Sequence, residues 1–207
     1  YRRQRQMCIR DSDKSERVPL TIAGYDREKG TVAIIFQKVG LSTELLGSLN
    51  EGDYIQDFVG PLGKPTDVEG KKRVCVVGGG VGCAIAYPSA KAFKEAGVEV
   101  DVIIGFRNKD IVILEDEFKA ACDHLYLMTD DGSYGEKGLV TNALKSLLDA
   151  GEQYDEVIGR EGKRGRLPVP FKIERIAHPG YHNPLTIPLQ SIRFMLQQAN
   201  ALTLHFL

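Results

Sequence analysis

The sequence lacks any run of about eighteen consecutive apolar residues, so it contains no ordinary membrane-spanning helix. Its basic N-terminus is not followed by the apolar stretch of a secretory signal. The formal net charge is only -1 although 27% of the residues are charged, which gives no indication of a nucleic-acid or acidic-membrane partner. We therefore expect a cytoplasmic protein that binds small molecules or another protein.

The sequence also lacks closely spaced cysteines. Its four cysteines, Cys8, Cys75, Cys83 and Cys122, are too far apart for the usual zinc or iron-sulfur ligand spacing, so we predict no metal site. Cys75 lies in an apolar run and is interpreted as a small core residue, not as a nucleophile.

The two ends differ in composition from the rest of the chain. Residues 1–12 show no apolar periodicity, which is typical of a foreign or disordered leader. Residues 159–207 are rich in proline and carry seven basic against two acidic residues. We expect an aberrant or unrelated tail that shares no packed core with the rest. A nucleic-acid-binding arm is the alternative, but the tail lacks the aromatic interleaving of a stacking platform.

Between the ends we expect two modules, 13–66 and 67–158, divided in the turn-rich segment Gly60–Pro65. In the first module, β-rich runs at 19–23 and 30–36 indicate antiparallel strands. About forty residues cannot close a barrel of about six strands, so we expect a truncated, partial antiparallel β-barrel. Ser42 is predicted to cap a short helix over 43–49.

The second module alternates strands and helices, which predicts an α/β fold with a three- to four-stranded parallel sheet covered on both faces. Strands are expected at 73–77, 98–104, 125–129 and 154–158, and helices at 84–96, 114–122 and 139–150. Pro88 is tolerable only if it lies near the first turn of its helix.

The glycine cluster Gly78–Gly82 connects a buried strand to a helix. A pyrophosphate at a helix N-terminus needs backbone amides and no Cβ in the way, so nucleotide binding is favoured over a simple tight turn. The spacing is G-G-G-x-G, and Arg107 follows the second strand where an acidic residue is usual in two-half dinucleotide folds. Arg107 either faces the adenosine end of a dinucleotide or is a solvated loop arginine.

Asp130 and Asp131 follow the third strand at the edge where open α/β sheets bind ligands. A magnesium site is disfavoured because glycines surround the carboxylates, which suits a loop over a nicotinamide or a flavin. The alternative is an Asx-type turn without a ligand contact.

In the first module, Arg17 offers a guanidinium for a diphosphate and Thr21 a hydroxyl for a flat polar ring.

The ordered motifs R-x-P-L-T, V-G-x-S-T, G-P-L-G, V-V-G-G-G-V-G and T-D-D-G-S-Y-G-x-K-G-x-V-T resemble the ferredoxin-NADP reductase superfamily over Glu16–Ile158. Within it the chain is most similar to the small FAD-carrying subunits of NADH-dependent reduced ferredoxin:NADP oxidoreductases. The electron-transfer subunits of dihydroorotate dehydrogenase are near relatives.

The resemblance implies a role for each motif. The predicted catalytic residue is Thr21, beside the flavin. The residues implied to hold FAD are Arg17, Pro19, Leu20, Thr21, Ile35, Phe36, Gln37, Gly40, Ser42 and Thr43. Those implied to hold the nicotinamide dinucleotide are Gly78, Gly79, Gly80, Val81, Gly82, Gly105, Arg107, Asp130, Asp131 and Gly132.

By the same resemblance the chain is an FAD-dependent NAD(P)H oxidoreductase subunit that moves a hydride between NAD(P)H and FAD for a larger iron-sulfur and flavin redox subunit. One alternative is the electron-transfer subunit of dihydroorotate dehydrogenase, although Leu20–Thr21 departs from its pattern. The other is a nucleotide-binding fragment without turnover. The family's C-terminal cysteine cluster is not found in this sequence, so its iron-sulfur centre is not supported.

Overall fold

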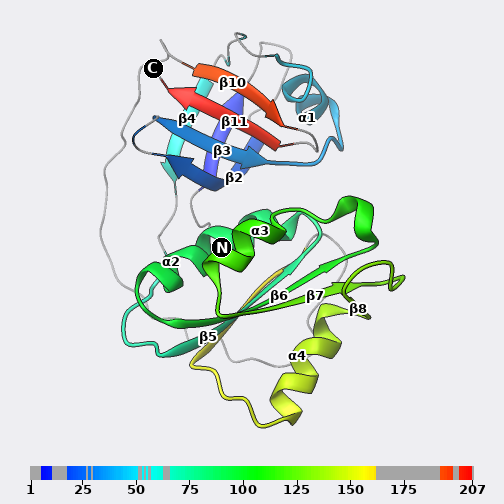
Figure 1. Cartoon of the computed structure of the whole chain (residues 1–207). Coiled ribbons are helices and arrows are strands. Elements are labelled where there is room, and N and C mark those ends of the chain that lie inside the picture. Colours follow the sequence, from blue (N-terminus) through cyan, green and yellow to red (C-terminus); the bar gives the residue numbers. More distant parts are fainter. Residues whose placement is uncertain are drawn as a thin grey trace.

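The protein is described by a computed structural model over residues 6–10, 18–26, 28, 30–50, 53, 55, 57–62, 66–161, 192–197 and 201–206. Figure 1 shows an antiparallel sheet stacked against a second unit in which helices flank a parallel sheet. Arg17 lies outside the described residues, as do most of the expected leader and tail. Within the described part of the chain, no helix is long and apolar enough to cross a membrane.

The antiparallel sheet has six strands in the order β10-β11-β3-β2-β1-β4. Their bounds are β1 Gln6–Arg10, β2 Val18–Asp26, β3 Thr31–Ile35, β4 Asp57–Leu62, β10 Ile192–Gln197 and β11 Ala201–Phe206. Strand β1 comes from the expected leader, and β10 and β11 come from the expected tail, so both segments contribute strands to this sheet. Gly60, Pro61 and Leu62 of the expected linker belong to β4. Where the domains divide stays a prediction.

The concave side of this sheet surrounds a small apolar core, which includes Ile22, Ile34 and Leu46. Helix α1, Leu41–Leu46, contributes to that core and begins after Gly40, not after the predicted Ser42. The reason is Thr43, whose Oγ1 accepts the Val39 and Gly40 amides over 2.9 and 3.1 Å. The capping side chain therefore belongs to a residue inside the helix and bonds to amides that precede it. The prediction that Ser42 is the N-cap is wrong.

The second sheet has five strands in the order β8-β7-β6-β5-β9, and every pair is parallel. The strands are β5 Arg73–Gly79, β6 Glu99–Phe106, β7 His124–Thr129, β8 Glu136–Lys137 and β9 Glu156–Glu161. The helices are α2 Gly82–Glu95, α3 Glu115–Ala121 and α4 Val140–Asp149, with a 3-10 turn, η1, at Lys109–Ile111. The predicted parallel sheet is confirmed, with the short β8 as an additional strand.

Alternation along β5 divides the core between the two faces of the sheet. Val74 and Val76 face α2 and α3, where Phe93 and Phe118 are fully buried. Cys75 and Val77 pack on the other side with residues of α4. Burial raises the pKa of the Cys75 thiol to about 12, which agrees with a core role for this residue.

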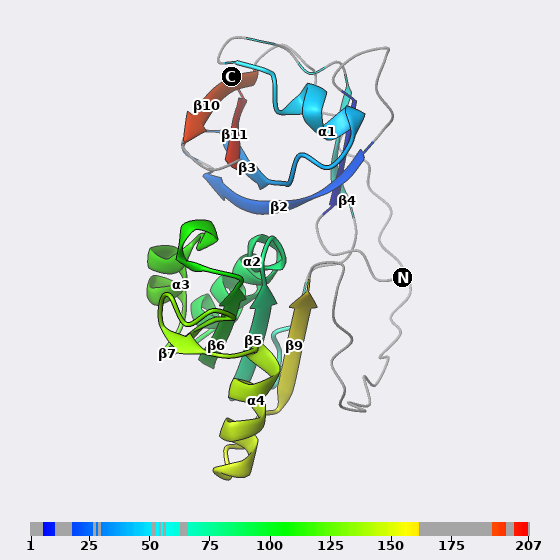
Figure 2. The ribbon, with the colours of Figure 1, turned by 90° about the vertical axis from the view of Figure 1, so that its right-hand side faces the viewer.

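Pro88 lies inside α2 and not in its first turn. The helix begins at Gly82, earlier than predicted, and so places the proline in the second turn. Figure 2 shows α2 directly beside β2, with the carboxyl ends of β5 and β9 pointing toward the antiparallel sheet. The ligand-binding edge expected of the parallel sheet thus faces the other unit.

Candidate functional site

The predicted dinucleotide residues converge at the carboxyl edge of the parallel sheet. Register places Gly79 beside Gly105, and Phe106 beside Thr129. Backbone hydrogen bonds then join the loops, because the Gly80 amide donates to the Gly105 carbonyl over 2.8 Å and the Asp130 amide to the Phe106 carbonyl over 3.0 Å.

The glycines at this edge serve different purposes. Gly80 has a φ of 53°, and a Cβ there would meet no protein atom within 4 Å. A Cβ on Gly78 would lie 3.1 Å from Cys83 Cα, and one on Gly105 would collide with the Val140 side chain. Gly78 and Gly105 therefore allow the helices to pack on the sheet, whereas Gly80 leaves open space where a ligand could approach the backbone.

The turn after β5 leads directly into the first turn of α2. The Cys83 amide donates to the Gly80 carbonyl and the Ala84 amide to the Val81 carbonyl, both over 3.1 Å. The remaining amides of this turn, those of Val81 and Gly82, are the donors that could meet an anion at the positive end of the helix. Such an arrangement suits a phosphate group.

The loop after β7 is folded tightly on itself. Thr129, which is fully buried, donates its hydroxyl to the Tyr134 carbonyl over 2.6 Å and accepts the Tyr134 amide. Asp131 accepts the Ser133 amide over 2.9 Å, and its bonds to Ser133 lower the pKa of the Asp131 carboxyl. Asp131 thus forms an Asx-type turn. Both aspartates are exposed, but the Asp131 carboxylate is engaged with Ser133, which makes Asp130 the better candidate for a ligand contact.

Basic residues follow β6 beside this acidic loop. Arg107 is exposed, and its carbonyl accepts the Asp131 amide over 3.4 Å. The Lys109 amide donates to the Ser133 hydroxyl over 2.9 Å. The two loops therefore present cationic and anionic side chains to the same edge of the sheet.

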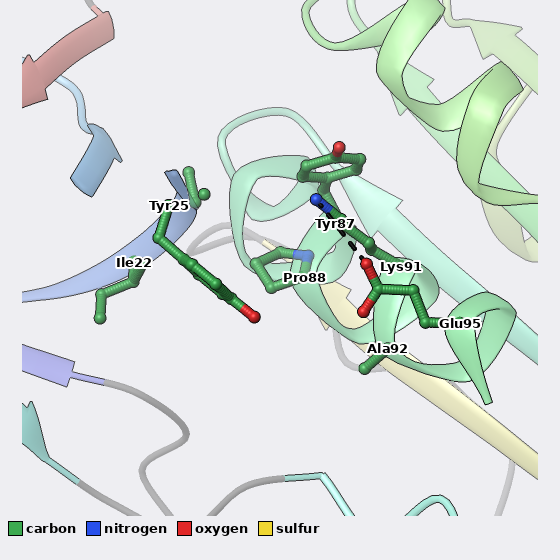
Figure 3. A pocket seen from close by; sticks show the side chains of 9 residues that line it. Ile22, Tyr25, Tyr87, Pro88, Lys91, Ala92 and Glu95 are labelled. Atoms are coloured by element: carbon green, nitrogen blue, oxygen red, sulfur yellow. Dashed lines mark ion pairs between the residues drawn. The ribbon is translucent and has the colours of Figure 1, made fainter. Parts of the chain in front are cut away.

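Thr21 faces the second unit from β2. It lines a small cavity whose other walls come from α2 and the segment before β5, including Thr66, Ile85 and Ser89. A neighbouring cavity between the same two elements is shown in Figure 3, where Tyr25 of β2 extends toward Pro88 of α2. The contact between β2 and α2 therefore brings Thr21 near the helix that begins at the glycine turn.

The remaining predicted FAD residues lie on β2 and around the end of β3. Pro19 is exposed and Leu20 half-buried on β2. Phe36 belongs to the apolar core, which leaves its neighbours Ile35 and Gln37 more accessible. The Thr43 hydroxyl is already engaged in capping α1, as are the Val39 and Gly40 amides.

A group that combines His, Asp and Glu lies at the opposite, amino edge of the sheet. Glu99, Asp101 and His124 approach one another there, but Asp101 is buried and forms an ion pair with Arg73 over 2.8 Å. A guanidinium already satisfies this carboxylate, so the cluster is better explained as an ion-pair network than as a metal site.

Comparison with solved structures defines the class of the fold. The chain matches a structure of the NADH-dependent reduced ferredoxin-NADP oxidoreductase with a TM-score of 0.71 and 38% identity, over 78% of this chain and 58% of that one. The cytochrome b5 reductase domain of Ulva prolifera nitrate reductase shares the fold alone, with a TM-score of 0.56 and 14% identity, over 78% of this chain and 76% of that one. The chain has a ferredoxin reductase-like fold.

Comparison with curated protein sequences gives relatives that are more similar in sequence than most of the solved structures. No family model matches the chain. It is 49% identical to a dihydroorotate dehydrogenase B electron transfer subunit homolog of Thermotoga maritima, over 69% of this chain and 50% of the relative. It is 39% identical to the electron transfer subunit of that enzyme in Fusobacterium nucleatum, over 67% of this chain and 55% of the relative. The chain spans about half the length of these relatives, which are described as electron-transfer subunits, and it is similar to them in sequence.

Sequence reasoning missed the contacts that hold the site loops in place. The sequence marks Tyr134 only as part of a motif and predicts no role for Glu115, which accepts the Tyr134 hydroxyl hydrogen bond over 3.0 Å. Nineteen positions separate the two residues, and neither lies on a recognisable pattern with the other. The sequence carries no signal from which this contact could have been found.

Proposed function

We propose that the chain is the cofactor-binding part of an electron-transfer subunit that moves a hydride between NAD(P)H and FAD for a larger iron-sulfur and flavin redox subunit. The observation that carries the proposal is the convergence of three loops, those after β5, β6 and β7, at an edge that faces β2. Thr21 of β2 lines a cavity with the helix that follows the first of these loops. This edge is where a parallel α/β sheet binds its ligand.

The glycine turn fits a dinucleotide. Gly80 leaves space beside the backbone, and the amides of Val81 and Gly82 stand at the start of a 14-residue helix. We assign the pyrophosphate to Gly78–Gly82, with Gly78 serving packing as well. Arg107 is then assigned to the adenosine end of the dinucleotide. Gly105, at the end of β6, is assigned to a close approach between the dinucleotide and the protein backbone.

The loop after β7 is assigned to the nicotinamide side of the site. Asp130 is exposed there, and Gly132 adopts a φ of 76°, which favours glycine and keeps the loop compact. Asp131 shapes the loop through its turn with Ser133 and so supports Asp130 without needing to contact the dinucleotide.

The residues of β2 are assigned to the flavin. Thr21 lies at the contact with α2 and would donate or accept a hydrogen bond at the flavin ring, while Pro19 and Leu20 would flank it. When bound, FAD supplies the hydride acceptor and donor, and the protein supplies orientation and electrostatics. The other residues proposed for FAD are Arg17, Ile35, Phe36, Gln37, Gly40, Ser42 and Thr43, with Phe36 and Thr43 acting through packing and capping.

A second candidate is the electron-transfer subunit of a dihydroorotate dehydrogenase. The observation that favours it is the likeness to the Thermotoga maritima and Fusobacterium nucleatum proteins, which are described as a homolog and as the electron transfer subunit of dihydroorotate dehydrogenase B. Both candidates use the same two cofactors in the same chain and differ in the partner subunit. Pull-down by a dihydroorotate-oxidising catalytic subunit, with transfer of electrons from NADH, would favour the second.

The proposal is tested by adding FAD to the purified chain and titrating it anaerobically with NADH while following the visible absorbance of the flavin. Gly80→Val should weaken NADH binding by at least about tenfold, because a branched side chain enters the space left for the pyrophosphate. Thr21→Val should leave NADH affinity unchanged and slow flavin reduction.

Gly97→Val is the matched control for Gly80→Val. Gly97 also has a positive φ, 78°, and open space around it, but it lies beyond the C-terminus of α2. Both variants should lose similar stability, yet only Gly80→Val should lose affinity. Equal NADH affinity in the wild type and Gly80→Val would refute the assignment of this turn.

A further inference from the structure

Two loops at the carboxyl edge are bonded to each other in several places. One follows β6 and leads to α3, and the other follows β7. The Lys109 amide donates to Ser133 Oγ over 2.9 Å, and the Lys109 ammonium lies 5.3 Å from the centre of the Tyr134 ring. The Asp131 amide also donates to the Arg107 carbonyl. The loops therefore behave as one structural element at the edge of the sheet.

A further contact joins the loop after β7 to the first residue of α3. The Tyr134 hydroxyl donates to Glu115 Oε1 over 3.0 Å, and the same oxygen lies 2.7 Å from Lys119 Nζ. The bond from Lys119, and then the bond from Tyr134, lower the pKa of the Glu115 carboxyl. The bond to Glu115 raises the pKa of the Tyr134 phenol, so the donor stays protonated and the acceptor stays charged.

The backbone just before Glu115 is in an unusual conformation. Leu114 has a φ of 60°, in the left-handed region that leucine adopts only at a cost. The fold accepts this conformation at the residue that starts α3 and so sets the position of Glu115. Strain of this kind is retained where the surrounding structure requires one placement of the chain.

We propose that Tyr134 and Glu115 are positioning residues, whose hydrogen bond fixes the loop that carries Asp130 relative to the loop that carries Arg107. This inference rests on the proposed function, in which both loops bind the dinucleotide. The bonds of Thr129 with Tyr134 and of Asp131 with Ser133 fix the shape of the loop after β7. The bond to Glu115 joins the Lys109–Ser133 and Asp131–Arg107 bonds in fixing where that loop lies.

The experiment measures NADH affinity by fluorescence titration in Tyr134→Phe, Glu115→Ala and the double variant. Tyr134→Phe keeps the ring, and with it the contact to Lys109, and removes only the hydroxyl. Each single variant should weaken NADH binding by about fivefold, and the double variant by no more than either one, because all three lose the same contact. Additive losses would overturn the proposal, as would wild-type affinity in Tyr134→Phe.

Two control variants separate positioning from general loss of structure. Lys119→Met removes the ion pair of Glu115 but keeps the tyrosine contact, so NADH affinity should stay at the wild-type level. Tyr154→Phe removes an equivalent hydroxyl bond, to Asp101 over 2.7 Å, at the opposite edge of the sheet. It should lower the midpoint of urea unfolding without changing NADH affinity, and a loss of affinity equal to that of Tyr134→Phe would contradict the proposal.

Hydrogen exchange distinguishes failure of the inference from failure of the proposed function. Tyr134→Phe should speed exchange of the Asp130 and Asp131 amides, which bond to the neighbouring loop, whether or not NADH binds. A wild-type chain that fails to bind NADH would refute the proposed function alone. Unchanged exchange of these amides in Tyr134→Phe would refute the positioning role.

Discussion

Arg73 at the start of β5 donates a hydrogen bond to Asp101 of β6 over 2.8 Å, and the carboxylate that it meets is fully buried. Asp101 also accepts the Tyr154 hydroxyl over 2.7 Å, and its other oxygen lies 2.8 Å from His124 Nδ1. The buried charge is therefore satisfied from β5, from β7 and from the segment between α4 and β9. This network holds the amino edge of the sheet, opposite the edge that carries the candidate site.

Replacement of Arg73 with methionine should destabilise the protein by about 3–5 kcal/mol, because it leaves the buried Asp101 carboxylate without its cation. Urea unfolding measures the loss. Arg107→Met is the control: Arg107 is exposed at the other edge, so the change in stability should stay within about 0.5 kcal/mol. Similar losses in the two variants would show that the buried pair is not the cause.

Gly135→Ala should be more destabilising than Gly97→Ala, although both residues have positive φ, 63° and 78°. A Cβ on Gly97 meets nothing within 4 Å, so only the conformational cost of about 1 kcal/mol applies. A Cβ on Gly135 would collide with the Leu127 carbonyl oxygen, and the loop would have to move. Thermal unfolding of the two variants compares the costs, and equal melting temperatures would contradict the expectation.

Asp155 should make the stability of the protein depend on acid pH. Its carboxylate accepts the Lys72 and Arg73 amides over 2.7 and 3.0 Å, and these bonds, that of Arg73 first, lower its pKa in the folded state. The stabilisation of the folded state by the Asp155 carboxylate is fully present above the pKa of this group in the unfolded chain, about 3.9. It is lost as the pH falls through the pKa of the group in the folded state.

Asp155→Asn should therefore melt at a lower temperature than the wild type at neutral pH, and the difference should shrink as the pH falls below about 4. Melting curves recorded from neutral pH to about pH 2 follow this difference. A gap in melting temperature that stays constant over the whole range would show that the carboxylate charge contributes nothing.

Pro88→Ala should stabilise α2. Proline in a helix interior removes one hydrogen bond and crowds the preceding turn, a cost of about 3 kcal/mol. Its half-buried ring packs toward β2, and losing that contact offsets about 1 kcal/mol, so we expect a net gain of about 1–2 kcal/mol in urea unfolding. A loss of stability would instead mean that packing between α2 and β2 dominates.

The parallel sheet was predictable because its strands carry their own signal. Val74–Val77 is a continuous apolar run, as buried parallel strands require. The two residues of β8, Glu136 and Lys137, are exposed and polar, so no local pattern distinguished that strand from a loop. Long-range pairing alone defines it.

The antiparallel sheet was harder to predict for the same reason. Pro61 suggested a linker, yet it lies in β4, an edge strand, where a missing amide is tolerated. Strand β1 lies between β2 and β4 although residues 6–10 show little alternation. Pairing with other strands, and not a local sequence pattern, defines these strands. One partner of β3 is β11, which lies far along the chain.

The candidate site was found from the sequence because glycine, arginine and aspartate follow successive strands at one edge. Geometry was needed to divide the roles, since Gly78 and Gly80 look alike in sequence but only Gly80 is open to a ligand. The Asx turn of Asp131 and the bond from Tyr134 to Glu115 likewise depend on the folded loops.

The position of β9 affects how the protein reaches its fold. Strand β5 pairs on one side with β6, but on the other with β9, and 83 positions separate Lys72 from Asp155 at the start of that second pairing. Closing so long a loop is entropically costly and slows folding. Until this loop closes, β5 is an edge strand that exposes five consecutive residues which are buried in the folded protein. During synthesis this apolar edge is open to incorrect pairing with other chains, and residues 156–161 end that exposure when they dock.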